Sequence, residues 1–414
     1  MTSQPPEPRA DRPTVAVVGG GPAGLIAAEE LARQHAAVTV YDRMPSPARK
    51  FLLAGHGGLN LTHTEPRERF LTRYGASAER LEPMLDAFSP QDLRDWCAGL
   101  GEETFAGTSG RVFPRSFRAT PLVRAWLARL DELGVRIERR RRWTGWSDER
   151  GLRFEGADGQ ETEVTPDAVV FALGGASWPR LGSDGGWIDE FAARGVAVAP
   201  LRPANVGVRV AWSEVFVGRF EGAPLKNVSL TVRGQDVTAR GDAMVTRSGL
   251  EGGPVYAIGA AIRRAFDDED PCVVEIDLRP DLTQAQLTDR LANRRPKDST
   301  ASWLRRALGL DPAAASLLRE PGALPDDPAA LARLVKAVPV TVDGTMPIEK
   351  AISTAGGIAW DEVDESLMLR RLPGTFVAGE MLDWEAPTGG YLLQASFSTG
   401  VAAARGVMRW LDER

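Results

Sequence analysis

A short run of apolar residues begins the ordered part of the sequence. Residues 14–19 read TVAVVG, which is typical of a strand buried on both faces of a parallel sheet. Gly20–Gly24 then turn the chain, Leu25–Gln34 are rich in helix-forming Ala, Leu and Glu, and Ala37–Asp42 form a second apolar strand. This order predicts a βαβ unit, which is the building block of a parallel sheet.

Two further helices and one more buried strand follow from similar patterns. Pro90–Gly99 is expected to be helical. Thr120 can cap a second helix, which has Pro121 in its first turn, an apolar face and an end at Gly134. Residues 167–175 (DAVVFALGG) again run from apolar positions into glycines, so they predict another parallel strand that ends beside a ligand.

The middle of the chain changes character. Short segments alternate apolar and polar positions between Gly-rich turns, which favours an antiparallel sheet or a small barrel, and residues 283–337 favour helices. Near the C-terminus the pattern of the first segment recurs, in which an apolar strand is followed by glycines and a helix. The strand lies in Pro373–Gly379, and the long helix extends to about Leu411. The alternating segments are 206–210, 228–232 and 273–278.

These patterns predict an α/β protein whose first domain is interrupted by an insert. The sequence before the first strand contains four prolines and no apolar stretch, so it is expected to be a loose tail. We expect a flexible tail at 1–13, a parallel-sheet domain at 14–199 and 343–414, an inserted β domain at 200–282 and a helical element at 283–342.

Composition and charge narrow the class of protein. Hydrophobic residues make up 43% and charged residues 26% of the 414 positions, which is typical of a globular chain. Fifty Lys and Arg oppose fifty-six Asp and Glu, so the net charge of −6 provides no general basic field for nucleic acid. No apolar run is long enough for a membrane helix, and the N-terminus does not resemble a secretory signal.

The cysteines and histidines exclude several kinds of site. Cys97 and Cys272 are the only cysteines, and their spacing fits neither a disulfide framework nor a CxxC pair, so a reducing cytoplasm is the expected compartment. Three histidines at unrelated spacings do not suggest a metal site. We therefore expect no metal.

The segment Gly19–Gly24 satisfies the GxGxxG pattern between a predicted strand and a predicted helix. Gly19 permits the tight turn, Gly21 lets the backbone approach a pyrophosphate, and Gly24 lets the helix pack closely on the strand. Asp42 ends the second strand, where an acidic residue binds the ribose hydroxyls of a dinucleotide. The alternative is a glycine turn without a ligand.

A second pattern near the C-terminus favours FAD. Phe376–Glu380 reads FVAGE, a strand ending in small residues and a carboxylate that can reach a ribityl hydroxyl, although Glu380 alone would resemble an ordinary surface residue. Gly389 and Gly390 follow, and then Tyr391, where another helix N-terminus can face the flavin ring and stabilise its reduced anion.

Five stretches resemble a known family. The sequence is similar to the flavoprotein family that includes BaiN and RdsA (YhiN-like proteins), and within it to the branch called aminoacetone oxidase family FAD-binding enzyme. The matching stretches are RKFLLAGHGGLNLTH (49–63), GTSGRVFP (107–114), LGGASWPRLGSDG (173–185), TAGGI (354–358) and AGEMLDWEAPTGGYLLQASF (378–397).

The resemblance implies a Rossmann-like FAD domain of the two-dinucleotide-binding type, with an inserted antiparallel β domain and a small helical element. It also implies that residues around 57–62 lie along the flavin, that Gly174 and Gly175 lie near the dinucleotide, and that the start of the last helix lies by the ring. From the motifs and the resemblance together, the candidate cofactor-binding residues are Gly19, Gly21, Pro22, Ala23, Gly24, Asp42, Arg43, Lys50, Gly57, Asn60, Leu61, Thr62, Gly174, Gly175, Gly379, Glu380, Gly389, Gly390, Tyr391 and Gln394.

Three positions depart from the family pattern. Gly58 and Leu59 stand where much of the family has Arg-Cys, so those groups cannot serve a substrate here. His56 in the same loop is the candidate catalytic residue that replaces them, and the alternative is that it packs or binds a flavin carbonyl. Asp42 stands where Glu is more common and has a shorter reach.

These observations predict an FAD-dependent oxidoreductase that acts on a small-molecule substrate. By resemblance, the reaction is reduction of an activated C=C bond, and because no second GxGxxG exists, NAD(P)H would be a transient electron donor. Three alternatives remain: an oxidase of a small amine, an enzyme that forms dihydrouridine in rRNA, and a flavin-binding protein without turnover. Arginine clusters at 111–142 and 290–306 motivate the rRNA alternative.

Overall fold

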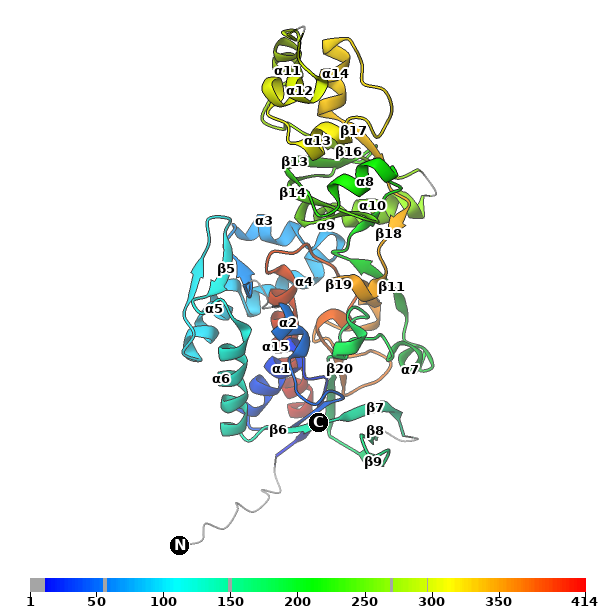
Figure 1. Cartoon of the computed structure of the whole chain (residues 1–414). Coiled ribbons are helices and arrows are strands. Elements are labelled where there is room, and N and C mark those ends of the chain that lie inside the picture. Colours follow the sequence, from blue (N-terminus) through cyan, green and yellow to red (C-terminus); the bar gives the residue numbers. More distant parts are fainter. Residues whose placement is uncertain (1–11, 55–57, 148–150, 269–270, 296) are drawn as a thin grey trace. The chain divides into compact units, whose positions relative to one another are not determined.

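The computed structural model describes residues 12–54, 58–147, 151–268, 271–295 and 297–414 (Figure 1). The chain forms two compact units. Unit 1 comprises Met1–Arg202 and Ser353–Arg414, and unit 2 comprises Pro203–Ile352. Unit 2 contains nearly all of the residues expected for the inserted β domain and for the helical element, and the division between those two stays a prediction.

Unit 1 is built on a five-stranded parallel sheet in the order β20-β10-β1-β2-β6, which confirms the predicted parallel α/β fold. The central strands β1 and β10 are almost entirely buried because each is an unbroken apolar run. Strand β20 joins the C-terminal part of the chain to this sheet. The strands are β1 (Thr14–Val18), β2 (Ala37–Asp42), β6 (Arg136–Arg139), β10 (Ala168–Phe171) and β20 (Thr375–Val377).

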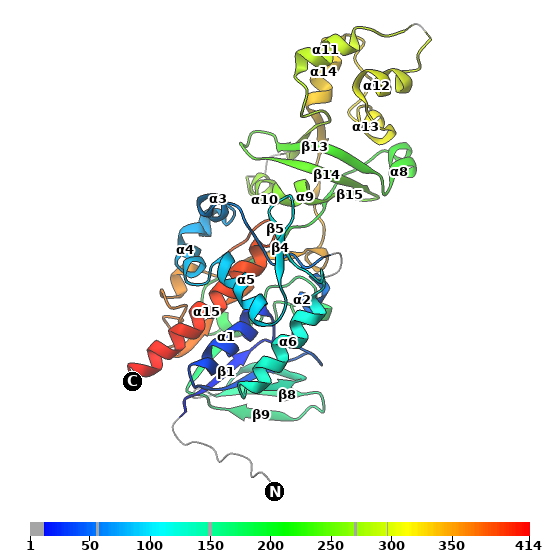
Figure 2. The ribbon, with the colours of Figure 1, turned by 90° about the vertical axis from the view of Figure 1, so that its left-hand side faces the viewer.

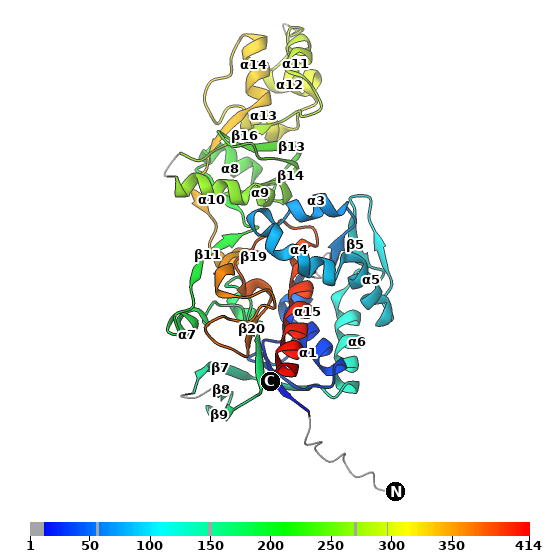
Figure 3. The same cartoon turned by 180° about the vertical axis from the view of Figure 1, so that it is seen from behind.

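Helices α1 (Pro22–Arg33) and α15 (Tyr391–Asp412) run side by side, as Figures 2 and 3 both show. A glycine is required at their closest approach, since a Cβ on Gly400 would lie 2.4 Å from the carbonyl oxygen of Ala23. Residues from both ends of the chain therefore share one hydrophobic core.

Helix α5 (Pro90–Gly99) has the predicted bounds, with Ser89 and Asp92 forming a capping box. Helix α6 spans Ala119–Glu132, so Thr120 lies inside its first turn and does not cap it, contrary to the sequence-based expectation. Arg118 holds the cap position and makes no side-chain cap hydrogen bond.

Two small antiparallel sheets complete unit 1, in the orders β3-β5-β4 and β7-β8-β9, and β11 pairs with β19. The sequence patterns did not predict the β7-β8-β9 sheet, which packs Trp143 and Trp146 against Phe171 and Phe191. The remaining elements are α2 (Arg49–Ala54), β3 (Thr62–His63), α3 (Arg67–Thr72), η1 (Gly75–Ser77), α4 (Ala78–Ala87), β4 (Thr104–Ala106), β5 (Arg111–Pro114), β7 (Arg141–Trp146), β8 (Leu152–Gly156), β9 (Glu161–Val164), η2 (Pro179–Leu181), α7 (Ile188–Ala192), β11 (Val198–Ala204), β19 (Ser353–Ile358), η4 (Trp360–Glu362) and η5 (Gly379–Met381).

Unit 2 contains a seven-stranded antiparallel sheet in the order β17-β16-β13-β14-β15-β12-β18. The sequence favoured either an antiparallel sheet or a small barrel. The structure has the open sheet, because β17 and β18 lie at opposite edges and do not pair with each other. Strands and helices share one core. The elements are β12 (Val208–Arg209), α8 (Glu214–Phe220), β13 (Pro224–Val232), β14 (Thr238–Thr246), β15 (Gly249–Glu251), α9 (Gly253–Ala257), α10 (Gly259–Asp267), β16 (Val273–Asp277), α11 (Gln284–Leu291), α12 (Thr300–Leu308), α13 (Pro312–Leu317), α14 (Pro328–Lys336), β17 (Val338–Thr341), β18 (Gly344–Thr345) and η3 (Ile348–Lys350).

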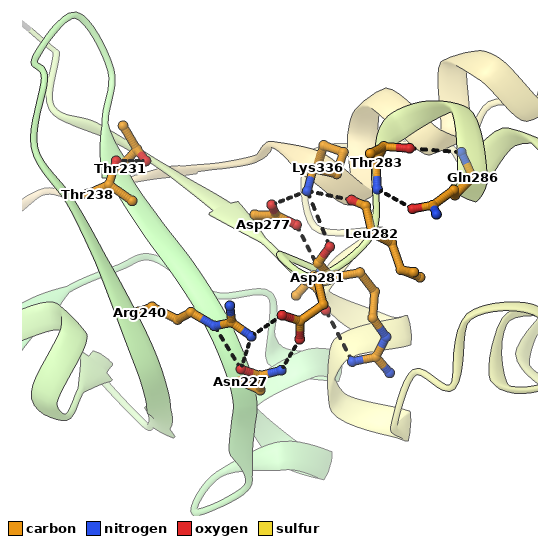
Figure 4. Close-up of polar contacts among 12 residues, drawn as sticks. Asn227, Thr231, Thr238, Arg240, Asp277, Asp281, Leu282, Thr283, Gln286 and Lys336 are labelled. Atoms are coloured by element: carbon orange, nitrogen blue, oxygen red, sulfur yellow. Dashed lines mark hydrogen bonds and ion pairs between the residues drawn. The ribbon is translucent and has the colours of Figure 1, made fainter. Parts of the chain in front are cut away.

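A polar network at the end of β16 fastens the helices of unit 2 to its sheet (Figure 4). Lys336, the last residue of α14, lies 2.5 Å from a carboxylate oxygen of Asp277 and donates to the carbonyl oxygen of Leu282. Asp281 accepts hydrogen bonds from Arg240 and Asn227 on β14 and β13. Polar side chains of the sheet and of the helical part of unit 2 thus form hydrogen bonds and an ion pair with one another where the chain passes from β16 to the helices.

Among the described residues, no helix combines the length and the apolar character that a membrane crossing requires.

Candidate cofactor site

The three glycines of the GxGxxG pattern, Gly19, Gly21 and Gly24, have different surroundings. A Cβ on Gly19 would lie 2.2 Å from the carbonyl oxygen of Ala172, and a Cβ on Gly24 would lie 1.9 Å from that of Gly19. Both positions therefore require glycine for packing. Gly21 has open space around its Cβ position, and it is the N-cap of α1 without a side-chain hydrogen bond. The free space and the uncapped N–H groups fit the predicted pyrophosphate role of Gly21.

Asp42 lies beside this turn at the end of β2. Its Oδ2 accepts a hydrogen bond of 3.0 Å from the N–H of Gly20, and its Oδ1 accepts one of 2.7 Å from the N–H of Met44. Burial raises the pKa of Asp42, although these two hydrogen bonds and nearby arginines act in the opposite direction. Each carboxylate oxygen has a second lone pair, so both can still accept a ribose hydroxyl.

Glu380 is held by groups from three separate segments. Its Oε1 accepts 2.8 Å from the N–H of Thr354, and its Oε2 accepts 2.8 Å from Nζ of Lys50 and 3.3 Å from the N–H of Gly175. Lys50 also donates to Oγ of Ser177 at 2.7 Å. Glu380 is therefore no ordinary surface carboxylate, because the protein fixes both of its oxygens at the ends of β10 and β20.

The segment that carries Glu380 lies against the start of α1, directly after the first glycine-rich turn. A Cβ on Gly379, which has φ of +73°, would lie 2.9 Å from Cβ of Ala23 at the start of α1. A Cβ on Gly174 would lie 3.1 Å from Oγ of Ser183 and 3.9 Å from Oε2 of Glu380. The two predicted halves of the dinucleotide site thus lie together in one unit.

A second uncapped helix begins in the same unit. Gly389 and Gly390 both have positive φ, +137° and +97°, and Gly390 is the N-cap of α15 without a side-chain hydrogen bond. A Cβ on Gly390 would lie 2.5 Å from Cα of Thr62, so the turn is pressed against β3. The first N–H groups of α15 and the positive end of its dipole can therefore face a ligand there.

Several buried polar atoms of these segments have no partner within the described part of the chain. They include Oδ1 of Asn60, Oγ of Ser183 and Oγ1 of Thr62, and the Thr62 side chain is completely buried. Buried polar atoms in proteins are nearly always hydrogen-bonded. Together with the two uncapped helices, these atoms fit a polar ligand as long as a flavin dinucleotide.

Other predicted residues have partners within the protein. Nε2 of Gln394 donates to the carbonyl oxygen of Phe88 and to Oγ of Ser398, and Leu61 is fully buried in the core. The guanidinium of Arg43 pairs with Asp184. Cofactor roles for these side chains stay predictions, and His56 and Gly57 lie outside the described residues.

Sequence reasoning missed several residues that complete the site. Ser177, Ser183 and Thr354 lie inside the quoted family motifs, but only the fold shows which atoms they contact. Glu65 and Arg73 lie outside those motifs and join the site through Tyr391, 326 residues after Glu65. No local pattern signals a contact across that separation.

An aromatic cluster lies beside Gly58, one of the positions at which this sequence differs from the family pattern. Phe105, Phe113 and Phe117 have ring centroids 5.0 to 5.9 Å apart, and a Cβ on Gly58 would lie 3.3 Å from the Phe117 ring. Phe117 is 48% exposed and has φ of +57°. Phe117 therefore presents an aromatic ring to solvent at the edge of this cluster.

The described residues offer neither a dithiol nor a metal cluster. Cys97 and Cys272 are both buried, and they belong to different units. No group of three or more His, Cys, Asp or Glu side chains in the described ranges could hold a metal ion.

The parallel sheet, the glycine-rich turn into α1 and the acidic residue at each of two strand ends define an FAD-dependent flavoprotein oxidoreductase. The chain belongs to the HI0933-like family, whose Rossmann-domain profile matches residues 13–406. The predicted resemblance to the BaiN/RdsA flavoproteins is confirmed for the family. The narrower aminoacetone oxidase branch stays a prediction.

Three known proteins illustrate the similarity. A 3-dehydro-bile acid delta(4,6)-reductase of Clostridium scindens is 27% identical over 94% of this chain and 98% of its own length. A ribosomal RNA dihydrouridine synthase of Escherichia coli is 24% identical over 94% and 96%. The structure of 3-ketosteroid delta1-dehydrogenase from Sterolibacterium denitrificans, with 14% identity and a TM-score of 0.50, covers 96% of this chain and 99% of that chain, and it shares the fold.

Proposed function

We infer that the protein reduces an activated C=C bond in a small-molecule substrate, with FAD as its resident cofactor and NAD(P)H as a transient electron donor. The observation that carries the cofactor assignment is the contact of Gly379, next to Glu380, with Ala23 at the start of α1, in a unit that also holds the uncapped N-termini at Gly21 and Gly390. The reductive direction is supported by the 27% identical reductase, which matches along nearly its whole length.

Each part of the site has a role toward the cofactor. The α1 N-terminus at Gly21 would bind the pyrophosphate, Asp42 the adenosine ribose and Glu380 a ribityl hydroxyl. The α15 N-terminus at Gly390 would face the flavin ring and favour negative charge on it. FAD, when bound, supplies the acceptance and donation of hydride.

Electrons must reach the site without a protein dithiol. Burial raises the pKa of the Cys97 thiol to about 12, with Glu102 acting in the same direction, so the thiolate is absent at neutral pH. Cys272 lies in unit 2. A nicotinamide nucleotide that docks against the ring is therefore the proposed donor, and His56 stays the candidate proton donor to the substrate.

An anaerobic spectroscopic titration tests the proposal. The purified protein is saturated with FAD and then mixed with NADPH or NADH in the absence of oxygen. We expect one of the nucleotides to bleach the flavin spectrum, and an enone-type acceptor to restore it. Flavin that only small amines bleach would support the oxidase alternative, and flavin that nothing reduces would support a binding protein without turnover.

A second candidate function is action on rRNA. Strand β5 begins at Arg111, and the segment after it carries Arg115, the exposed Phe117 and Arg118; Arg115 pairs with Glu103. Aromatic rings stack on unpaired bases, while arginines contact phosphates. Two rRNA dihydrouridine synthases are 24% identical to this chain.

RNA binding distinguishes this candidate from the first. If the hairpin binds RNA, F117A should weaken binding of single-stranded rRNA fragments about tenfold, consistent with 1–3 kcal/mol per stacked base. V215A, which shortens another exposed apolar side chain, is the matched control. Affinity that does not change with salt would contradict the RNA function, because phosphate contacts release counterions.

A further inference from the structure

Tyr391, the first residue of α15, is fixed by an ion pair between Glu65 and Arg73, two residues that lie outside the sequence motifs. Its hydroxyl donates to Oε1 of Glu65 at 2.5 Å. Arg73 donates to the same carboxylate with two nitrogens, Nε to Oε1 at 2.9 Å and Nη2 to Oε2 at 2.8 Å. The Glu65 side chain is only 7% exposed, whereas the Arg73 side chain is 33% exposed, so the carboxylate is shielded from solvent on one side and the guanidinium only in part.

The protonation states of Glu65 and Tyr391 are well defined. Burial works against the charge of Glu65, but the hydrogen bonds from Arg73 and Tyr391 outweigh it and lower the pKa of Glu65. Burial raises the pKa of Tyr391, and the adjacent Glu65 raises it further. At neutral pH, Glu65 is an anion and Tyr391 a neutral hydrogen-bond donor, which makes this hydroxyl a poor acid for catalysis.

The ring and the main chain of Tyr391 are fixed as well. His63 stacks on the ring with centroids 5.5 Å apart, and the ring of Phe70 lies 5.0 Å away. The hydroxyl of Tyr74 donates to the carbonyl oxygen of Tyr391 at 2.9 Å. Side chains from β3, α3 and the turn after it therefore enclose the residue at which α15 begins.

These contacts determine where the α15 N-terminus lies. Gly389 and Gly390, both with positive φ, form a turn that is free to move unless its neighbours hold it. The fully buried Thr62, whose Oγ1 has no partner among the described residues, lies against this turn. An N–H group acts on a ligand only at close range, so a small displacement of the turn weakens its effect.

We propose that Arg73, Glu65 and Tyr391 are positioning residues that hold the N-terminus of α15 against the flavin ring and thereby raise the reduction potential of the bound cofactor. This inference rests on the proposed position of the ring at α15. The electrostatic logic is that the positive end of the helix stabilises the reduced flavin anion more than the neutral oxidised ring.

The reduction potential of the bound flavin tests the proposal. Y391F removes only the hydroxyl, keeps the ring packing and leaves the Glu65–Arg73 pair intact. We expect its midpoint potential to fall by about 30 mV, a tenfold change in the equilibrium of a two-electron couple. FAD should remain bound. Y74F, which frees the Tyr391 carbonyl, should give a smaller fall and provides a second variant if Y391F does not fold.

Two further variants separate positioning from direct electrostatics. R69Q is the matched control, because Arg69 is 72% exposed and reaches the same carboxylate at only 3.5 Å. Its potential should equal that of the unmodified protein. E65Q removes a negative charge, and if Glu65 acted only through space, E65Q would raise the potential while Y391F left it unchanged. That result would overturn the proposal.

FAD uptake separates this inference from the proposed function. If the unmodified protein binds no FAD, both the cofactor assignment and this inference are wrong. If it binds FAD and Y391F has an unchanged potential, only the positioning role is wrong.

Discussion

Lys50 and Glu380 lie 330 residues apart in the sequence, and Nζ of the first is 2.8 Å from Oε2 of the second. The contact joins α2, which follows β2, to the turn after β20. Because the same carboxylate also accepts from two backbone N–H groups, it fixes three segments of unit 1 relative to one another.

Removing the lysine charge should destabilise the protein and weaken cofactor binding. In K50M the mostly buried Glu380 keeps its backbone donors but loses its only ionic partner in the described structure. We expect a loss of about 1–3 kcal/mol in the free energy of unfolding, the usual cost of an incompletely paired buried group. Urea denaturation of the apoprotein and FAD titration measure the two effects. K50R, which keeps the charge, should lose less of both, and a K50M protein as stable as the original would contradict this role.

Two glycines of the first turn should respond differently to the same substitution. G21V places its side chain in open space, in an extended backbone that any residue adopts, so the apoprotein should melt normally but bind FAD at least a hundredfold more weakly, about 2.7 kcal/mol. G24V forces a Cβ to within 1.9 Å of a backbone oxygen, so the fold itself should lose about 1–3 kcal/mol. Circular dichroism melting and flavin fluorescence separate these results, and stoichiometric FAD in G21V would refute the phosphate role.

The contribution of Glu65 to stability should depend on pH. Folding lowers its pKa below the usual 4.5, since the hydrogen bonds from Arg73 and Tyr391 outweigh the opposing effect of burial. A carboxyl group of this kind stabilises the fold above its unfolded-chain pKa, and the stabilisation is lost as the pH falls through the folded-state pKa. E65Q should therefore cost about 1.5–3 kcal/mol at pH 7, in the range of hydrogen bonds to charged groups. The cost should shrink in urea titrations below pH 4, and an equal cost at both pH values would contradict the ionic role.

Thiol reagents should not affect electron transfer to the flavin. Burial raises the pKa of Cys97 to about 12, so Cys97 is almost entirely a thiol at pH 8, and burial also raises the pKa of Cys272. Treatment of the folded protein with iodoacetamide should leave anaerobic flavin reduction by NAD(P)H unchanged, and mass spectrometry should find Cys97 unmodified. Rapid loss of reduction on alkylation would point to a thiol in the electron path.

The features that could be predicted from the sequence are mostly local. The β1–α1–β2 unit follows from apolar runs and glycines within about thirty positions, and the fixed handedness and close packing of such units leave few alternatives. The positions of Asp42 and Glu380 could also be predicted, because each acidic residue comes at or just after the end of an apolar strand. In unit 2 the alternation predicted antiparallel strands, but their order depends on pairing between distant segments that alternation does not encode.

The features that were missed depend on distant contacts or on short elements. Strands β7, β8 and β9 have only four to six residues each, too few for a clear period, and their Trp143 and Trp146 were not recognised as a core. The start of α6 was misplaced because Thr120 is a good capping residue, whereas the N-cap is Arg118, two positions earlier. The Tyr391–Glu65–Arg73 cluster required the fold to bring β3, α3 and α15 together.

The edge strand β20 and the covering helix α15 come from the last part of the chain. During synthesis, the apolar side of α1 that packs on α15 therefore has no cover until residues 391–412 have left the ribosome. The core of unit 2 uses only residues between 208 and 342, so it can close earlier. A ribosome that stalls before codon 391 would release a chain with a folded insert and an unsealed sheet, which chaperones and proteases would recognise.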